Sequence, residues 1–179
     1  HETGARANVL RGSYRLAEAA DRAYERARQS AARFLNAAAD EIVFTGGTTA
    51  ALNLVAQSFG SLLEPGDRVV VSQAEHHSNF VPWQMLRERR GVELALIPVL
   101  ADGTLDLAHL PQVIDGRTRL VAVTQCSNVT GARTDVAAIV AAARKVGARV
   151  LLDGAQAVQH GPQDVQALGV DFYAFSGHK

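Results

Sequence analysis

Lysine is scarce in this chain, and the setting of one of its two lysines is suited to covalent chemistry. The chain has 179 residues, 18 of them Lys or Arg, and its lysines are Lys145 and Lys179. A lysine that forms a Schiff base must first lose its proton, which requires burial or a neighbouring positive charge. Lys179 follows the apolar run 172–175 and a Ser-Gly turn, so we expect it at the edge of a sheet. By itself, it would be interpreted as a surface lysine.

Polar residues also follow the other apolar runs of the chain. In a parallel α/β sheet, ligands bind outside the carboxyl ends of the strands, so residues that follow strands are candidates for a site. In chain order the stretches that follow strands are TGGTT (45–49), EHHSN (75–79), QCSN (125–128), DGAQ (153–156) and SGHK (176–179). We therefore predict that they gather at one edge of the sheet.

Several candidates also have an ordinary structural interpretation. The Gly-Gly-Thr-Thr stretch at 46–49 could cradle a phosphate at the start of a helix, but a tight turn with an N-cap would give the same pattern. Asp153 directly follows an apolar run, where either a functional carboxylate or a turn cap is found. Asn128 and Gln156, taken singly, would be routine loop residues.

The histidines and the cysteine do not indicate a metal site or a nucleophile. His76 and His77 are adjacent, and adjacent residues rarely face the same ion without further ligands. The sequence contains no HExxH motif, so no metal site is predicted. Cys126 is the single cysteine, and we interpret it as a buried thiol.

Segments of strand and helix character alternate between the candidate residues. A helical pattern covers 14–34. Apolar runs predict six strands, at 42–44, 69–71, 94–99, 120–123, 150–152 and 172–175. Helical patterns lie between them at 48–63, 78–90, 105–114 and 135–146. This alternation predicts a single α/β domain of parallel βαβ units, with helices on both faces of the sheet.

The composition excludes several classes of protein. The 18 basic residues balance 18 acidic ones, so the chain has no electrostatic footprint for nucleic acid or acidic membranes. One cysteine excludes an intrachain disulfide framework and a cysteine-based zinc site. No apolar run reaches the roughly 18 residues that a membrane-spanning helix needs. We expect a cytoplasmic protein with no nucleic-acid or membrane partner.

Seven short motifs together resemble the class V branch of the fold-type I pyridoxal-phosphate enzymes. Within that branch they are most similar to the cysteine desulfurase and selenocysteine lyase group. The motifs are ANVLRG (7–12), GTT (47–49), EHHSN (75–79) with VPW (81–83), DGTL (102–105), SNVTG (127–131), DGAQA (153–157) and SGHK (176–179). Each is common by itself, whereas seven in the family's order, over almost the whole chain, are specific.

The resemblance implies a three-layer αβα large domain with a mostly parallel sheet. Residues 1–40 would form an N-terminal segment and a long helix, and residues 41–179 would form the cofactor-binding large domain. In the family, a segment just after the lysine supplies an antiparallel strand, which inserts between the first and sixth strands of this chain. We therefore expect the chain to stop after its sixth strand, partway through the large domain.

The resemblance also implies roles for the candidate residues. Lys179 would hold pyridoxal 5'-phosphate as a Schiff base and later move the proton at Cα. Asp153 would pair with the pyridine nitrogen and keep the ring protonated, so that the ring accepts electrons from Cα. His76 would stack on the ring face and act with Lys179 in catalysis.

The remaining candidates would hold other parts of the cofactor. Gln156 and Asn128 would hydrogen-bond the phenolic oxygen, and Asn128 also matches a family position near the substrate carboxylate. The phosphate would be bound by Thr48, Thr49, Ser176 and His178.

The implied activity is removal of sulfur from L-cysteine, which leaves L-alanine and a persulfide on a cysteine downstream of this chain. A homodimer, a sulfur-acceptor protein and a place in iron–sulfur cluster assembly are implied by the same resemblance. Other class V activities stay open, namely selenocysteine lyase, a kynureninase-like lyase or an epimerase. The persulfide cysteine and a substrate-binding arginine of the family fall outside residues 1–179. The non-enzymatic alternative is therefore that residues 1–179 bind the cofactor or a partner but are catalytically silent.

Overall fold

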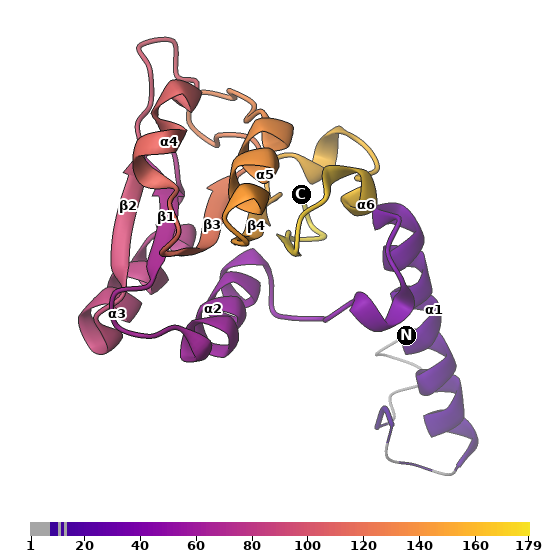
Figure 1. Cartoon of the computed structure of the whole chain (residues 1–179). Helices are drawn as coiled ribbons and strands as arrows, with labels where there is room; N and C mark the ends of the chain where they lie inside the picture. The colour runs from indigo at the N-terminus through magenta and orange to yellow at the C-terminus, as the bar shows by residue number, and fades with distance from the viewer. Residues whose placement is uncertain (1–7, 11, 13) are drawn as a thin grey trace. The chain divides into compact units, whose positions relative to one another are not determined.

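The computed structural model describes residues 8–10, 12 and 14–179 (Figure 1). Two residues of the first motif, Ala7 and Arg11, lie outside this set. The chain divides into two compact units. One comprises the described residues up to Phe44 together with Pro162–Asp164, and the other comprises Thr45–Gly161 with Val165–Lys179. A domain boundary between residues 40 and 41 stays a prediction.

The first unit is built on the long helix α1 (Arg15–Leu35), which confirms the helical pattern in this part of the sequence. Its buried positions are Ala17, Ala20, Ala32 and Leu35. The helix ends at Leu35, and the next residue, Asn36, has a left-handed backbone with φ of 51°. This turn lets the N–H of Ala37 reach the carbonyl of Ala32 at 2.9 Å, so one of the free carbonyls at the helix end is satisfied.

The strand predicted at 42–44 is not formed, and the described residues contain five strands rather than six. A strand needs a neighbour for its backbone N–H and C=O groups, and no other described segment pairs with 42–44. Instead, the Arg28 guanidinium donates to the carbonyl of Ile42. The same guanidinium lies 5.1 Å from the ring centre of Tyr24 and 5.3 Å from that of Phe44.

The second unit contains one parallel sheet. Its strands are β1 (Arg68–Ser72), β2 (Glu93–Ile97), β3 (Thr118–Thr124), β4 (Arg149–Asp153) and β5 (Phe172–Ala174). They lie in the order β2-β1-β3-β4-β5, and each neighbouring pair is parallel. At the carboxyl ends of β3 and β4, Thr124 is opposite Asp153. This register brings two of the predicted polar strand ends side by side.

Helices cover both faces of the sheet (Figure 1). They are α2 (Thr48–Ser58), α3 (Val81–Arg90), α4 (Leu110–Val113), α5 (Val136–Lys145) and α6 (Val165–Leu168). On one face Val121 packs in a cluster with Ile139 of α5 and residues of α4. On the other face Leu120 packs with Leu52 of α2 and Trp83 of α3. Neighbouring residues of β3 therefore point to opposite layers, which confirms the three-layer αβα architecture.

Three of the predicted helices are shorter than their sequence patterns. The patterns at 48–63, 78–90 and 105–114 each overlap a 3-10 turn, at Phe59–Leu62, His77–Asn79 and Leu107–His109 respectively. In the last two, the α-helix begins only near a proline, Pro82 or Pro111, because proline lacks the N–H that a preceding turn would need. The short helix α6 has no counterpart among the predicted elements. No helix of the described residues is long and apolar enough to cross a membrane.

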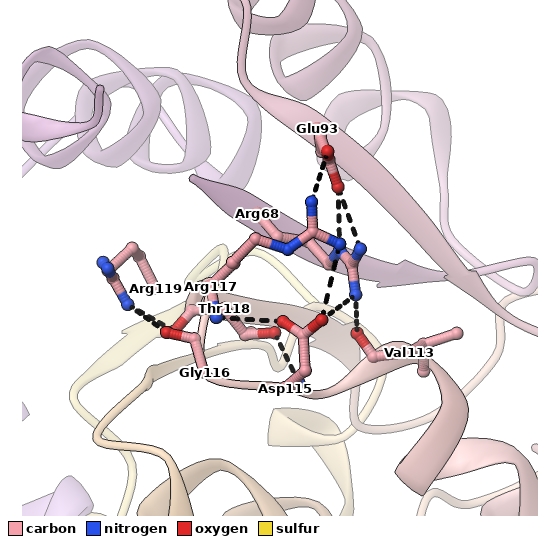
Figure 2. Close-up of polar contacts among 8 residues, drawn as sticks. All are labelled: Arg68, Glu93, Val113, Asp115, Gly116, Arg117, Thr118 and Arg119. Carbon is pink, nitrogen blue, oxygen red and sulfur yellow. Dashed lines mark hydrogen bonds and ion pairs between the residues drawn. The ribbon is translucent and has the colours of Figure 1, made fainter. Parts of the chain in front are cut away.

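Charged side chains form a network at the amino ends of the strands (Figure 2). Arg68 donates through Nη2 to Glu93 and through Nη1 to Asp115, each at 2.9 Å, and Arg117 donates to Glu93 at 2.6 Å. The hydrogen bond from Arg68 holds the pKa of Glu93 below its usual value. The backbone N–H of Arg117 is the main cause that lowers the pKa of Asp115. These groups are therefore held in their charged forms.

Candidate active site

All nine residues predicted to form a site line one pocket in the second unit, with a volume of about 350 Å³. They come from the ends of β1, β3, β4 and β5 and from the start of α2. The pocket is also lined by Gly46, Gly47, Ser78, Thr124, Cys126 and Ala155. The structure thus brings the predicted candidates together at the carboxyl edge of the sheet, while their individual roles stay predictions.

One end of the pocket is suited to an anion. The N–H of Thr48 donates to Oγ of Ser176 at 2.9 Å, and the hydroxyls of the two residues are 2.7 Å apart. Gly47 precedes α2 with φ of 130°, and a Cβ there would lie 3.3 Å from the same Ser176 oxygen. The first N–H groups of α2 and its dipole favour negative charge at this position. Hydroxyls, a glycine and a helix start therefore converge here.

Asp153 supplies a buried carboxylate to the pocket. It is the last residue of β4 and is 4% exposed. Its Oδ1 accepts a hydrogen bond from the N–H of Ala155 at 2.9 Å. Burial raises the pKa of Asp153, while that hydrogen bond and the nearby side chains of His76 and Lys179 act in the opposite direction. A cationic ligand group would therefore be favoured beside this carboxylate.

His76 is held by the turn that follows it. Its Nδ1 accepts a hydrogen bond from the N–H of Ser78 at 3.1 Å and lies 2.8 Å from the Ser78 hydroxyl. Because a backbone N–H can only donate, Nδ1 is the acceptor and the neutral ring has its proton on Nε2. The ring thus keeps Nε2–H as the donor that is not used by the turn.

Glu75, the residue before His76, belongs to the EHHSN motif, but the sequence predicted no role for it. Glu75 is partly exposed as a residue, yet its carboxyl group accepts hydrogen bonds from Ser72, Asn79 and Thr124. Burial, together with the charge of Asp153, raises its pKa to about 7, although the three hydrogen bonds oppose the shift. The sequence signal for this residue was a carboxylate close to the end of an apolar run. Its hydrogen-bond partner Thr124 could not be predicted, because it is 49 residues away in the sequence.

Most of the remaining candidates are exposed, as His76 is. Lys179 and His178 are exposed in the last turn, where the N–H of Lys179 donates to the carbonyl of Ser176 at 3.3 Å. Asn128 is exposed in the loop after β3, and Gln156 is partly buried after β4. Gln156 already has a partner within the chain, because its Oε1 accepts a hydrogen bond from Nε2 of Gln159 at 3.2 Å.

Cys126 lines the same pocket as a buried thiol, as its interpretation predicts. Its Sγ lies 3.5 Å from the carbonyl of Gly131 within its own loop. Among the described residues, no group of three or more His, Cys, Asp or Glu side chains could hold a metal ion.

Tyr173 lies against the Asp153 turn and was not among the predicted residues. Its hydroxyl donates to Oε1 of Gln125 at 2.9 Å. A Cβ at Gly154 would lie only 2.1 Å from that hydroxyl, so glycine is required for this close approach. Burial and the charge of Asp153 raise the pKa of Tyr173, which therefore stays a neutral donor.

Comparison with known families agrees with this geometry. The model of the family described as aminotransferase class V matches residues 2–179. The chain belongs to this family. The pocket can therefore be compared with the sites of other members of the family.

Two relatives have high similarity to the chain. A cysteine desulfurase from Pectobacterium atrosepticum is 53% identical over 97% of this chain and 43% of its own length. The apo structure of a cysteine desulfurase from Thermococcus onnurineus is 40% identical, with a TM-score of 0.93 over 98% of this chain and 44% of that one. The chain thus spans less than half the length of these relatives.

A second solved structure records a cofactor. It is a lysine-to-alanine mutant of C-DES with glycine covalently linked to its PLP cofactor. It is 28% identical to this chain, with a TM-score of 0.83 over 92% of this chain and 44% of that one. In that relative the shared fold holds pyridoxal phosphate.

Proposed function

We propose that the protein is a pyridoxal-phosphate-dependent cysteine desulfurase and that residues 45–179 contain most of its cofactor site. The observation that supports this most directly is one pocket lined by the buried carboxylate of Asp153, the ring of His76, the start of α2 and Lys179. The cysteine desulfurases at 53% and 40% identity support the same activity.

The residues of the pocket fit this cofactor group by group. The hydroxyls of Thr48 and Ser176, with Thr49, His178 and the start of α2, suit a phosphate dianion. The buried Asp153 suits a protonated ring nitrogen, because burial makes an isolated carboxylate costly and a cationic partner favourable. When bound, pyridoxal phosphate supplies a ring that withdraws the electron pair left at the substrate Cα.

Each of the chain's own residues would then have a separate role in binding the cofactor or in catalysis. Asp153 keeps the proton on the ring nitrogen by accepting its hydrogen bond. His76 contacts the ring, and Nε2–H is the donor it has available. Gln156 and Asn128 hydrogen-bond the phenolic oxygen, and Asn128 also approaches the substrate carboxylate. Lys179 holds the cofactor and transfers the proton at Cα through Nζ.

The sulfur acceptor of the reaction would be a cysteine outside these 179 residues. Its thiolate attacks the sulfur of L-cysteine, the Cβ–S bond breaks, and a persulfide forms. The electron pair of that bond stays on the substrate carbon, which takes up a proton and leaves as L-alanine. Cys126 is not assigned this step, because it is buried and held within its own loop.

The wider setting follows from the same relationship. We propose a cytoplasmic homodimer that passes sulfur to an acceptor protein in iron–sulfur cluster assembly. The names of the cysteine desulfurase relatives support the cysteine substrate. A selenocysteine lyase, a kynureninase-like lyase or an epimerase would share the cofactor pocket and differ in the product formed.

The two lysines offer a direct test with a matched control. In the full-length protein, Lys179→Ala is expected to abolish the visible absorption band that borohydride reduction removes, and to abolish alanine release from cysteine. Lys145→Ala, on the exposed last turn of α5, is expected to leave both unchanged. An unchanged band in Lys179→Ala would contradict the assignment. Products other than alanine and persulfide would indicate one of the other class V activities.

A further inference from the structure

A directional chain of hydrogen bonds connects the core to the loop that contains His76. The indole Nε1 of Trp83 donates to Oδ1 of Asn79 at 3.2 Å. Trp83 is 1% exposed and Asn79 is fully buried. An indole N–H can only donate, so it fixes which side of the Asn79 amide faces α3. Nδ2 of Asn79 must then point the other way, and it donates to Oε2 of Glu75 at 2.6 Å.

The second oxygen of Glu75 is surrounded by donors as well. Oε1 accepts from the backbone N–H of Thr124 at 2.8 Å and from the hydroxyl of Ser72. All three neighbours of this carboxyl group therefore donate to it. An ionised carboxylate satisfies every one of these bonds, since it offers acceptors on both oxygens.

These bonds connect the His76 loop to the strand beside Asp153. Thr124 ends β3 and is paired in register with Asp153 at the end of β4. On the other side of the loop, the N–H of Asn79 donates to the carbonyl of His76 at 2.8 Å. The backbone of His76 is thus held between Glu75, bonded to β3, and Asn79, bonded to the core.

We propose that Glu75 is a positioning residue that holds His76 in the pocket through the Thr124–Glu75–Asn79–Trp83 chain of hydrogen bonds. The proposal rests on the proposed function for the role of His76, but the bonds themselves belong to this chain and need no ligand. Glu75 acts through His76 and touches neither cofactor nor substrate.

An amide at position 75 cannot replace the carboxylate. In Glu75→Gln the new amide nitrogen would face Nδ2 of Asn79, donor against donor. Rotating the amide of Asn79 only moves the clash, because its nitrogen would then face the indole N–H of Trp83. In either orientation one buried donor stays unsatisfied, which costs stability in the loop.

The same logic predicts a rescue by exchanging the two functional groups. In the double variant Glu75→Gln with Asn79→Asp, the amide at 75 donates to a carboxylate at 79. That carboxylate also accepts from Trp83, and the amide oxygen accepts from Ser72 and Thr124. Every donor again meets an acceptor. Asn79→Asp alone would place two carboxyl groups against each other and is expected to be harmful.

The test compares E75Q, N79D, the double variant and E88Q in the full-length protein. Glu88 is exposed on α3, so E88Q is the matched control. The first measurement is hydrogen exchange of the backbone amides at 76–80, in protein with and without added pyridoxal phosphate. The second is the pH dependence of the cofactor's visible absorption band. We expect exchange roughly tenfold faster in each single variant, a shifted pH midpoint, and a return of both to within about threefold of wild type in the double variant.

The outcomes separate this proposal from the proposed function. The hydrogen-bond chain would be contradicted if the amides at 76–80 exchanged at the wild-type rate in E75Q. It would also be contradicted if exchange in the double variant were as fast as the combined effects of the two single variants predict. Faster exchange with an unchanged pH midpoint would overturn the positioning role. If the single variants fail to fold, Ser72→Ala removes a hydroxyl that donates to Glu75 and accepts from the N–H of Ala74, and wild-type exchange in that variant would overturn the proposal. Loss of the proposed function would appear separately, as a protein without a cofactor band whose exchange still follows the rescue pattern.

Discussion

The two edges of the parallel sheet treat acidic side chains in opposite ways. At the amino edge, Glu93 and Asp115 are bonded to Arg68 and Arg117, and their pKa values are lowered (Figure 2). At the carboxyl edge, Asp153 is buried and Glu75 is half-buried, both have raised pKa values, and neither is in an ion pair among the described residues.

This difference shows at which edge the charged side chains already have partners within the chain. At the amino edge each charge already has its partner, so a ligand would gain little there. At the carboxyl edge the carboxylate of Asp153 is paired mainly with a backbone N–H, and its charge is disfavoured by burial. A bound cation would relieve that cost, which makes the carboxyl edge the one suited to chemistry.

The largest effect is expected from neutralising the carboxyl edge. Asp153→Asn keeps the shape of the side chain but removes the charge that would hold a ring proton. We expect kcat/KM for alanine release from cysteine to fall on the order of 10²- to 10³-fold. Because a costly buried charge is removed, the free energy of unfolding should not fall. Asp115→Asn at the amino edge is the control, and it should retain activity. Near-wild-type turnover in Asp153→Asn would contradict the contrast between the edges.

The second prediction concerns the pH dependence of stability. The pKa of Glu75 is raised from 4.5 to about 7, so the folded state binds its proton more tightly than the unfolded state does. This contribution is fully present below pH 4.5 and is lost as pH rises through 7. Relative to E75Q, the free energy of unfolding of the wild type should fall over this range by up to roughly 3 kcal/mol. Urea unfolding between pH 4.5 and 8 measures it, and parallel curves would contradict it.

The third prediction is that a substitution at the amino edge lowers stability without affecting the cofactor, the opposite of the result expected for Asp153→Asn. The Arg68 side chain is 12% exposed and bonds Glu93, Asp115 and the carbonyl of Val113. Arg68→Met keeps much of the apolar stem and removes these bonds, so we expect a loss of about 1–3 kcal/mol in the free energy of unfolding. The cofactor's absorption band should be unchanged. A shifted band with unchanged stability would mean that the two edges are not separate.

The smallest effect is expected at the rim of the same network. Arg117 contacts Glu93 and Asp115, but its side chain is 52% exposed. Solvent and salt screen such a pair, so Arg117→Ala should destabilise by roughly a third or less of the Arg68→Met effect. Thermal unfolding at low and high salt measures this, and an effect as large as that of Arg68→Met would show that exposure does not decide the strength of these pairs.

The sequence was sufficient for the layers and for the composition of the pocket, because both follow local rules. Alternation of apolar runs and helical patterns determines a parallel α/β sheet, and such sheets collect strand-end residues at one edge. Asp153 and His76 are found in this way. The strand at 42–44 was predicted wrongly because β-branched and aromatic residues indicate strand preference but not the presence of a neighbour.

Glu75 illustrates what could not be predicted. Its position after β1 is visible in the sequence, but its environment depends on Thr124, which reaches it only when β3 lies beside β1. The same is true of Tyr173 and Gly154, whose close approach requires β5 to be next to β4. Pairings between distant strands determine these contacts, and no local pattern encodes them.

The bond between Thr48 and Ser176 joins residues 128 positions apart, and this has a consequence during protein synthesis. A ribosome adds about 5–20 residues per second, so the start of α2 emerges on the order of ten seconds before its partner. During that interval the anion end of the pocket lacks one of its hydroxyls, and Lys179 has not been made. A ligand of this pocket therefore cannot guide the early folding of the nascent chain. It can select only a sheet that has already assembled through β5.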